Sequence, residues 1–153
     1  MSSSVEVAYI ALGSNLGDRA GYLAAARVAI ASIPGVELIA ATGVEETAPI
    51  GPEQPHYLNQ MVAVRTELAA GALLAALLEI ELANGRQRTA RWSPRTLDLD
   101  IVRFGDSVIA SQGLVVPHRE LEHRPFWLRE VAELDHALGR HAPDTRQHAG
   151  SER

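Results

Sequence analysis

The chain has 153 residues and a formal net charge of −5, which suits one globular domain and argues against an extended nucleic-acid-binding surface. It contains no cysteine, which excludes disulfides, thiol nucleophiles and thiolate metal sites. All fourteen basic residues are arginine, which excludes lysine Schiff bases and P-loops that depend on a lysine.

Hydrophobic periodicity and turn residues predict an alternating order of strands and helices. In chain order we expect a strand at 5–12, a structural turn at 13–15, a helix at about 17–32, strands at 36–46 and 57–68, a helix at 71–84, a strand at 97–104, a short strand at 107–110, a turn at 115–118 and a last helix at 126–134. The proline-rich segment 47–55 and the arginine-rich segment 85–94 are predicted to be loops, the second of them mobile.

The order β-α-β-β-α-β predicts an α+β fold, a ferredoxin-like βαββαβ sandwich in which helices pack on one face of an antiparallel sheet. We expect residues 1–153 to form a single domain, with a compact part at about 5–135 and a poorly ordered tail at about 136–153. The apolar run 69–78 is too short to cross a bilayer, and residues 1–4 do not resemble a signal peptide. The sequence therefore predicts a soluble, cytoplasmic protein.

The segment from Arg91 to Ile101 carries the most distinctive chemistry of the chain. From Leu97 onward apolar and acidic residues alternate, so Asp98 and Asp100 should point to the same face of a strand. Two neighbouring carboxylates repel each other unless a cation lies between them, and Mg²⁺ prefers a few carboxylate oxygens together with phosphates and water. The pair therefore suggests a magnesium site.

Planar cations that suit phosphate lie just upstream of this pair, at Arg86, Arg88, Arg91 and Arg95. Carboxylates for metal beside arginines for phosphate suggest a nucleotide-handling site. The alternative is that the acids form the solvated face of an exposed strand. The same face continues into Val102 and Phe104, so it is not polar along its whole length.

Glu81 lies at the edge of the apolar stripe predicted for the helix at 71–84. A carboxylate at that position is either an ordinary surface acid or a group with a specific partner. Spacing alone leaves both interpretations open.

Several segments together resemble the 6-hydroxymethyl-7,8-dihydropterin pyrophosphokinase family, from Val7 to about Leu128. The segments that carry the resemblance are AYIALGSNLGD at 8–18, TAPIGP at 47–52, YLN at 57–59, ELANGR at 81–86, RWSPRTLDLD at 91–100, VPH at 116–118 and RPF at 124–126. The block at 91–100 is highly specific, and the other segments follow in the family's order.

The resemblance implies transfer of a pyrophosphoryl group from MgATP to the hydroxymethyl oxygen of the pterin, with release of AMP, in folate biosynthesis. It implies an ATP-dependent pyrophosphokinase that acts as a monomer on these small molecules and binds neither nucleic acid nor a membrane. Asp98 and Asp100 would hold two Mg²⁺ ions, and Arg86 and Arg95 would join them in catalysis. The other residues that the resemblance assigns to ATP are Glu81, Arg88, Ile101, His118 and Arg124, and those that it assigns to the pterin are Thr47, Ala48, Ile50, Tyr57, Asn59, Trp92 and Phe126.

This chain departs from the family pattern near the expected nucleotide site. Gly113 and Val115 stand where some members have arginine and threonine, and Arg119 replaces a tyrosine or proline. These departures leave open a non-catalytic domain that kept the pterin pocket and lost turnover. A third interpretation is a palm-like, nucleotidyl-transferring domain, against which the short chain and the negative net charge argue.

Overall fold

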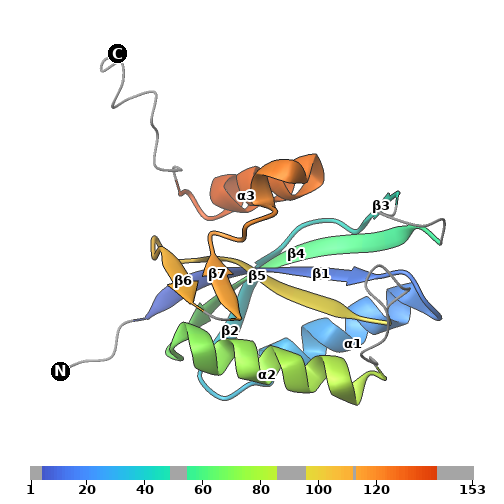
Figure 1. Ribbon diagram of the computed structural model, residues 1–153, viewed down its shortest axis with the longest axis horizontal. Helices are drawn as coiled ribbons and strands as arrows, with labels where there is room; N and C mark the ends of the chain where they lie inside the picture. Colours follow the sequence, from blue (N-terminus) through green and yellow to red (C-terminus); the bar gives the residue numbers. More distant parts are fainter. Residues whose placement is uncertain (1–4, 49–54, 86–95, 112, 141–153) are drawn as a thin grey trace, which may run out of the picture.

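The computed structural model describes residues 5–48, 55–85, 96–111 and 113–140 (Figure 1). Its elements in chain order are β1 (Glu6–Ser14), α1 (Arg19–Ala31), β2 (Val36–Ala41), β3 (Glu45–Thr47), β4 (Tyr57–Thr66), α2 (Ala70–Ala83), β5 (Asp98–Phe104), β6 (Ile109–Ser111), β7 (Leu114–Val116), the 3₁₀ turn η1 (Leu121–His123) and α3 (Pro125–Ala137).

The main sheet has the strand order β2-β4-β1-β5, and each neighbouring pair is antiparallel. The short strand β3 also pairs with β4, antiparallel, and β6 and β7 form a separate hairpin. With α1 between β1 and β2 and α2 between β4 and β5, this arrangement confirms the predicted α+β, ferredoxin-like βαββαβ fold.

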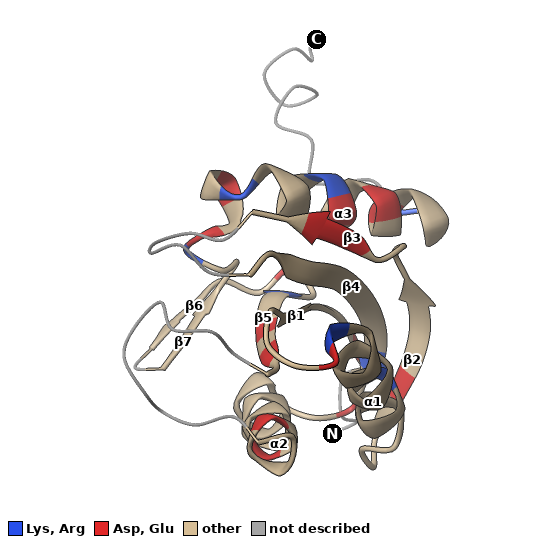
Figure 2. Cartoon of the chain, turned by 90° about the vertical axis from the view of Figure 1, so that its right-hand side faces the viewer, with Lys and Arg blue, Asp and Glu red and all other residues tan. Residues whose placement is uncertain are grey.

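Helices cover both faces of the sheet. Helices α1 and α2 pack below the sheet and α3 packs above it, as both views show (Figures 1 and 2). The expectation that the helices cover one face is therefore wrong for the last helix. The reason is that β1 and β4 bury residues on both faces, so a single helical layer would leave half of their apolar side chains in water. No helix within the described residues is long and apolar enough to cross a membrane.

Alternation along β1 divides the core between these two layers. Ile10 and Leu12 belong to the cluster beneath the sheet, which includes Leu23 of α1 and Leu73 of α2. Tyr9 and Ala11 belong to the cluster above it, and α3 supplies that cluster with apolar residues. The side chains of β1 that share the α3 face become smaller toward its C-terminal end, from Tyr9 through Ala11 to Gly13, and all three residues are buried.

The strand predicted at 36–46 is two strands, because the regular pairing with β4 is interrupted between Ala41 and Glu45. The backbone N–H of Met61 donates to the Thr42 hydroxyl at 3.0 Å, and the Gln60 side-chain amide donates to the Thr42 carbonyl at 2.6 Å. The Thr42 backbone N–H still donates to the Met61 carbonyl at 2.9 Å, and β3 begins only at Glu45. Hydrophobic alternation across the interruption could not reveal it.

The turn predicted at 115–118 is also placed differently in the structure. Val115 and Val116 belong to β7, which pairs with β6 in the register Ile109↔Val116. The reversal lies before β7, next to Gly113, whose φ of 87° favours glycine. Pro117 ends the strand and does not form the centre of the turn, because proline cannot donate to a ladder.

The last helix is longer than predicted and is fixed by polar contacts. It runs from Pro125 to Ala137, and Leu138 packs against the upper core. The Tyr9 hydroxyl donates to Asp135 Oδ1 at 2.6 Å, and Arg103 Nη1 lies 3.4 Å from Asp135 Oδ2. Burial, followed by the hydrogen bond to Asp135, raises the pKa of Tyr9 above its ordinary value. Part of the predicted tail, residues 136–140, is thus ordered, and residues 141–153 lie outside the described residues.

Replacing Tyr9 with phenylalanine should lower the free energy of unfolding by about 1–2 kcal/mol, because the buried Asp135 carboxylate loses its shortest hydrogen bond. Urea denaturation measures the change. Tyr22→Phe is the matched control, since Tyr22 is only partly buried against the lower core, and its effect should stay within about 0.5 kcal/mol. Equal effects of the two substitutions would contradict this account of α3.

Candidate active site

The central strand β1 brings two sets of predicted site residues to either side of one glycine. In the register of the sheet, Gly13 is opposite Asn59 on β4 and opposite Asp98 on β5. Two residue pairs away, Ala11 is opposite Asp100. Because neighbouring strands lie about 4.8 Å apart, Asn59 and Asp98 are roughly 10 Å from each other across Gly13.

Asp98 and Asp100 occupy the face of β5 that points away from α1 and α2. Leu99 and Ile101, which alternate with them, are buried in the core beneath the sheet. Both aspartates are half-buried, and Val102, next on their own face, belongs to the upper core. The two carboxylates thus lie side by side where the strand leaves the packed core.

His118 lies next to Asp100. Its Nε2 is 3.6 Å from Asp100 Oδ1, and its Nδ1 accepts a hydrogen bond from the Glu120 backbone N–H at 3.0 Å. Because Nδ1 is an acceptor, the neutral ring carries its proton on Nε2, toward the carboxylate. The Trp127 ring lies edge-on to the imidazole, with 4.9 Å between the two ring centres, and this contact fixes the plane of the imidazole.

Glu81 supports this strand from below. It is 4 % exposed on α2, and its Oε2 accepts a hydrogen bond from the Leu99 backbone N–H at 2.6 Å. Leu99 lies between the two aspartates, so the buried carboxylate fixes the backbone that presents them. The alternative of an ordinary surface acid is therefore wrong.

On the other side of Gly13, the residues predicted for the pterin line one wall. Asn59 Nδ2 donates to the Thr47 hydroxyl at 2.5 Å, which ties β4 to the end of β3. The Tyr57 ring lies above Gly13, where an added Cβ would be 3.3 Å from Tyr57 Cδ1. Ala48 follows β3 directly and is exposed.

Helix α3 carries Phe126, another residue predicted for the pterin, in its first turn. Phe126 is half-buried there, and its ring lies edge-on to Trp127 at 6.3 Å. The Arg124 guanidinium carbon lies over the Trp127 ring, 4.4 Å from its centre. Trp127 thus links Phe126, Arg124 and His118 in one cluster.

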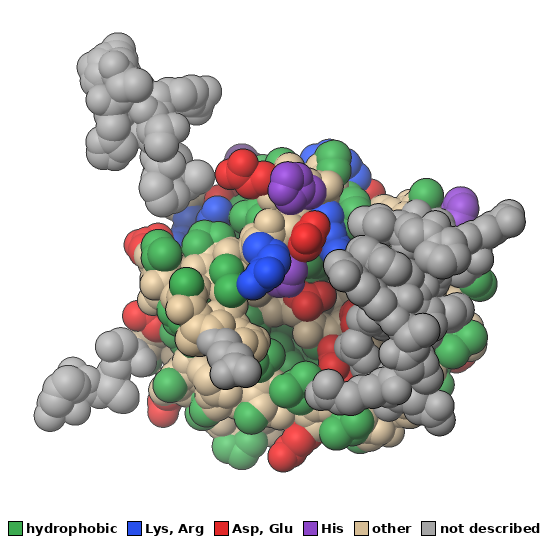
Figure 3. Space-filling view, in the orientation of Figure 1, with side chains coloured by type: hydrophobic (Ala, Val, Ile, Leu, Met, Phe, Trp, Pro, Cys, Tyr) green, Lys and Arg blue, Asp and Glu red, His purple; other side chains and the backbone are tan. Residues whose placement is uncertain are grey.

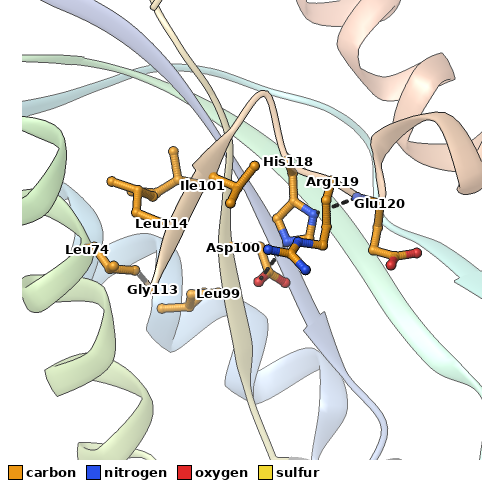
Figure 4. Close-up of a pocket in the computed structure, with 10 residues that line it drawn as sticks. Leu74, Leu99, Asp100, Ile101, Gly113, Leu114, His118, Arg119 and Glu120 are labelled. Carbon is orange, nitrogen blue, oxygen red and sulfur yellow. Dashed lines mark hydrogen bonds and ion pairs between the residues drawn. The ribbon is translucent and has the colours of Figure 1, made fainter. Parts of the chain in front are cut away.

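A cavity of about 350 Å³ lies beside the edge strand β5 and reaches the β6–β7 hairpin and α2. Asp100, His118 and Arg119 lie at one end of it, and apolar side chains line the other end (Figure 4). In the space-filling view, charged side chains and histidine gather above the hollow and hydrophobic ones lie below it (Figure 3). The full lining is Leu74, Leu99, Asp100, Ile101, Gly113, Leu114, Val115, His118, Arg119 and Glu120.

Some predicted site residues cannot be placed. Ile50, Arg86, Arg88, Trp92 and Arg95 lie outside the described residues, so their roles stay predictions. The prediction that Gly13 belongs to a turn is wrong, because Gly13 lies within β1 beneath Tyr57. A glycine inside an apolar strand was the available signal for a close approach at this position.

Comparison with known proteins supplies the family. Residues 9–136 match the family model of 7,8-dihydro-6-hydroxymethylpterin-pyrophosphokinase. The chain belongs to this family. Two proteins named 2-amino-4-hydroxy-6-hydroxymethyldihydropteridine pyrophosphokinase are each 41 % identical to it. The match to the one from Pseudomonas aeruginosa covers 92 % of this chain and 90 % of that protein. The match to the one from Bacillus subtilis covers 84 % of this chain and 77 % of that protein.

The structural comparison agrees at the level of the fold. A solved HPPK-DHPS structure in complex with substrates matches with a TM-score of 0.54 and 14 % sequence identity. The match covers 69 % of this chain and 29 % of that one. Family membership makes the chain an ATP-dependent pyrophosphokinase of folate biosynthesis, as the sequence predicted.

Replacing Gly13 with alanine should lower the free energy of unfolding by about 1 kcal/mol, because the new Cβ lies 3.3 Å from the Tyr57 ring and the ring must move. Chemical denaturation measures the loss. Gly71→Ala is the control, since nothing lies within 4 Å of its added Cβ in α2, and it should stabilise by about 0.5–1 kcal/mol. A stabilising effect at both positions would show that Gly13 is not a close approach.

Proposed function

We propose that the pterin and the triphosphate of ATP lie on the upper face of the sheet, and that the base of ATP lies in the cavity at the edge strand β5. The pterin would lie between Asn59 and Phe126, and ATP beside Asp98 and Asp100. The observation that supports this is the register of β1, in which Gly13 separates Asn59 from Asp98 by about two strand spacings. The hydroxymethyl group and the triphosphate would then meet between Asn59 and Asp98.

The proposed reaction is attack of the pterin's hydroxymethyl oxygen on the β-phosphorus of ATP. A bond forms between that oxygen and the β-phosphorus, the bond from the β-phosphorus to the α-phosphate oxygen breaks, and AMP leaves. Such a transfer needs little covalent chemistry from the protein, so positioning and electrostatics should supply most of the rate enhancement.

Asp98 and Asp100 fit the requirements of Mg²⁺. They form an acidic pair, and within the described ranges no group of three or more His, Asp and Glu residues could hold a metal alone. Mg²⁺ is commonly held by one or two carboxylates together with substrate phosphates and water, so a pair of acids beside a triphosphate is sufficient. We propose two ions at this pair. When bound, they would neutralise charge on the phosphate oxygens.

The cavity beside β5 is the proposed nucleotide pocket. Its apolar end, with Leu74, Ile101 and Leu114, suits the flat face of a base, and its polar end lies beside Asp100. His118, Arg124 and the predicted arginines Arg86, Arg88 and Arg95 would face the phosphates. Gly113, Val115 and Arg119, the departures from the family pattern, all line this cavity. Nucleotide contacts are therefore where this chain should differ from its relatives.

The pterin site combines aromatic faces with one amide. Asn59 is 7 % exposed, and its Nδ2 is held by Thr47, so its orientation is fixed before substrate binds. An amide donates and accepts at once, which suits the edge of a pterin ring. Tyr57 and Phe126 would supply ring contacts, with Ala48, Ile50 and Trp92 completing the enclosure. A single-domain, monomeric and cytoplasmic enzyme remains part of the proposal.

The carboxylate pair can be tested by Asp98→Asn and Asp100→Asn. Each should reduce Mg²⁺-dependent AMP formation from ATP and 6-hydroxymethyl-7,8-dihydropterin by about 10²-fold or more, because the metal loses a charged ligand. Chromatographic quantification of AMP measures the rate, and circular dichroism checks the fold. Asp106→Asn, an exposed acid just beyond β5, is the control and should retain activity. Full activity in both site variants would show that the metal assignment is wrong.

A further inference from the structure

Glu130 is a buried carboxyl group that the proposed reaction does not use. It lies on the sheet-facing side of α3 and is 3 % exposed. Neither of its carboxylate oxygens makes a hydrogen bond of good geometry within the described residues. An ionised carboxylate in such surroundings is costly, so the group must either carry a proton or destabilise the helix that bears it.

The charges around Glu130 favour the protonated form. Burial raises its pKa to about 8, and the carboxylate of Glu45 on β3 contributes further. On α3 itself, Glu133 acts in the same direction and Arg129 opposes it. Thr42, a neutral residue between β2 and β3, also faces Glu130 and lowers its pKa. At neutral pH the carboxyl is therefore mostly uncharged.

Glu130 lies at the contact that joins α3 to β3. Arg129, its neighbour on the helix, donates to Glu45 at 2.9 Å, which ties α3 to β3 at the surface. Figure 2 shows β3, with its acidic residues in red, directly beneath α3. One helical turn before Glu130 is Phe126, which is proposed to contact one side of the pterin. At the other end of β3, Thr47 holds Asn59, which is proposed to contact the pterin's edge.

We propose that Glu130 is a positioning residue whose neutral carboxyl keeps α3 packed on β3, and that it thereby fixes the spacing between Phe126 and Asn59 across the pterin site. This inference rests on the proposed function, because it concerns the same site. Loss of the proton places a buried negative charge on Glu130 near the carboxylate of Glu45, and repulsion separates α3 from β3. The carboxylates beside ATP lie on β5, so the nucleotide site should respond much less.

The test compares wild type with Glu130→Gln, a neutral variant of nearly the same shape, in steady-state assays from pH 6.5 to 9. The wild-type KM for the pterin, divided by that of the variant, should rise at least three-fold above pH 8. The corresponding ratio for ATP should stay constant. Ionisation of the pterin itself affects both proteins equally and cancels in the ratio.

Stability against pH gives a second readout. Because the folded pKa is raised from about 4.5 to about 8, the folded protein binds more protons than the unfolded chain between these values. The Tm of wild type should therefore fall between pH 4.5 and 8 relative to that of Glu130→Gln, and the difference should level off above pH 8. Glu122→Gln, a change at an exposed acid in η1 that does not contribute to the raised pKa of Glu130, should keep the wild-type dependence of Tm and of the pterin KM.

Should Glu130→Gln fail to fold, Glu45→Gln replaces it. That change at the partly exposed Glu45 keeps Glu130 but removes the carboxylate that it would repel, so the alkaline rise in pterin KM should shrink. A pterin KM ratio that stays flat to pH 9 in an active wild-type enzyme overturns the positioning role. Wild-type protein that forms no AMP at pH 7 overturns the proposed function instead, so the two failures are distinguishable.

Discussion

The register of β1 is the constraint on which the rest of the structure depends. Hydrogen bonding on both edges sets Gly13 opposite Asn59 and Asp98 at once, and sets Ala11 opposite Asp100. A slip of one residue would turn the side chains of β1 to the other face and would break both relationships. Since β1 buries side chains on both faces, that slip would also place Tyr9 among the residues beneath the sheet. Packing and site geometry are therefore specified by the same set of contacts.

The second layer of the fold follows from the same strand and gives the site its depth. Helix α3 covers the upper core and begins beside the candidate site, so Phe126 and Arg124 stand at its rim. Its far end is fixed to the sheet by the Tyr9–Asp135 hydrogen bond. On the α3 face of β1, Ala11 is buried in the upper core and Gly13 is buried beneath the Tyr57 ring. The glycine lets that ring lie close against the strand.

Much of this could be predicted from the sequence because its signals are periodic. Alternation around Asp98 and Asp100 gave their common face, and apolar spacing gave the helices and the order of strands. Features that depend on single contacts could not be predicted. The break at Thr42 depends on bonds to β4, and the close approach at Gly13 depends on Tyr57 above it. Glu130 could not be recognised as buried, because its helix turns it toward a layer that the predicted one-sided sandwich lacked. Tertiary context decided each of these positions.

The most direct measurement is a crystal structure with a non-hydrolysable MgATP analogue and 6-hydroxymethylpterin bound together. The account predicts metal density touching both Asp98 and Asp100, the base beside Leu74 and Ile101, and the pterin within hydrogen-bond distance of Asn59. A nucleotide bound away from β5, or a pterin on the α1–α2 side of the sheet, would contradict it.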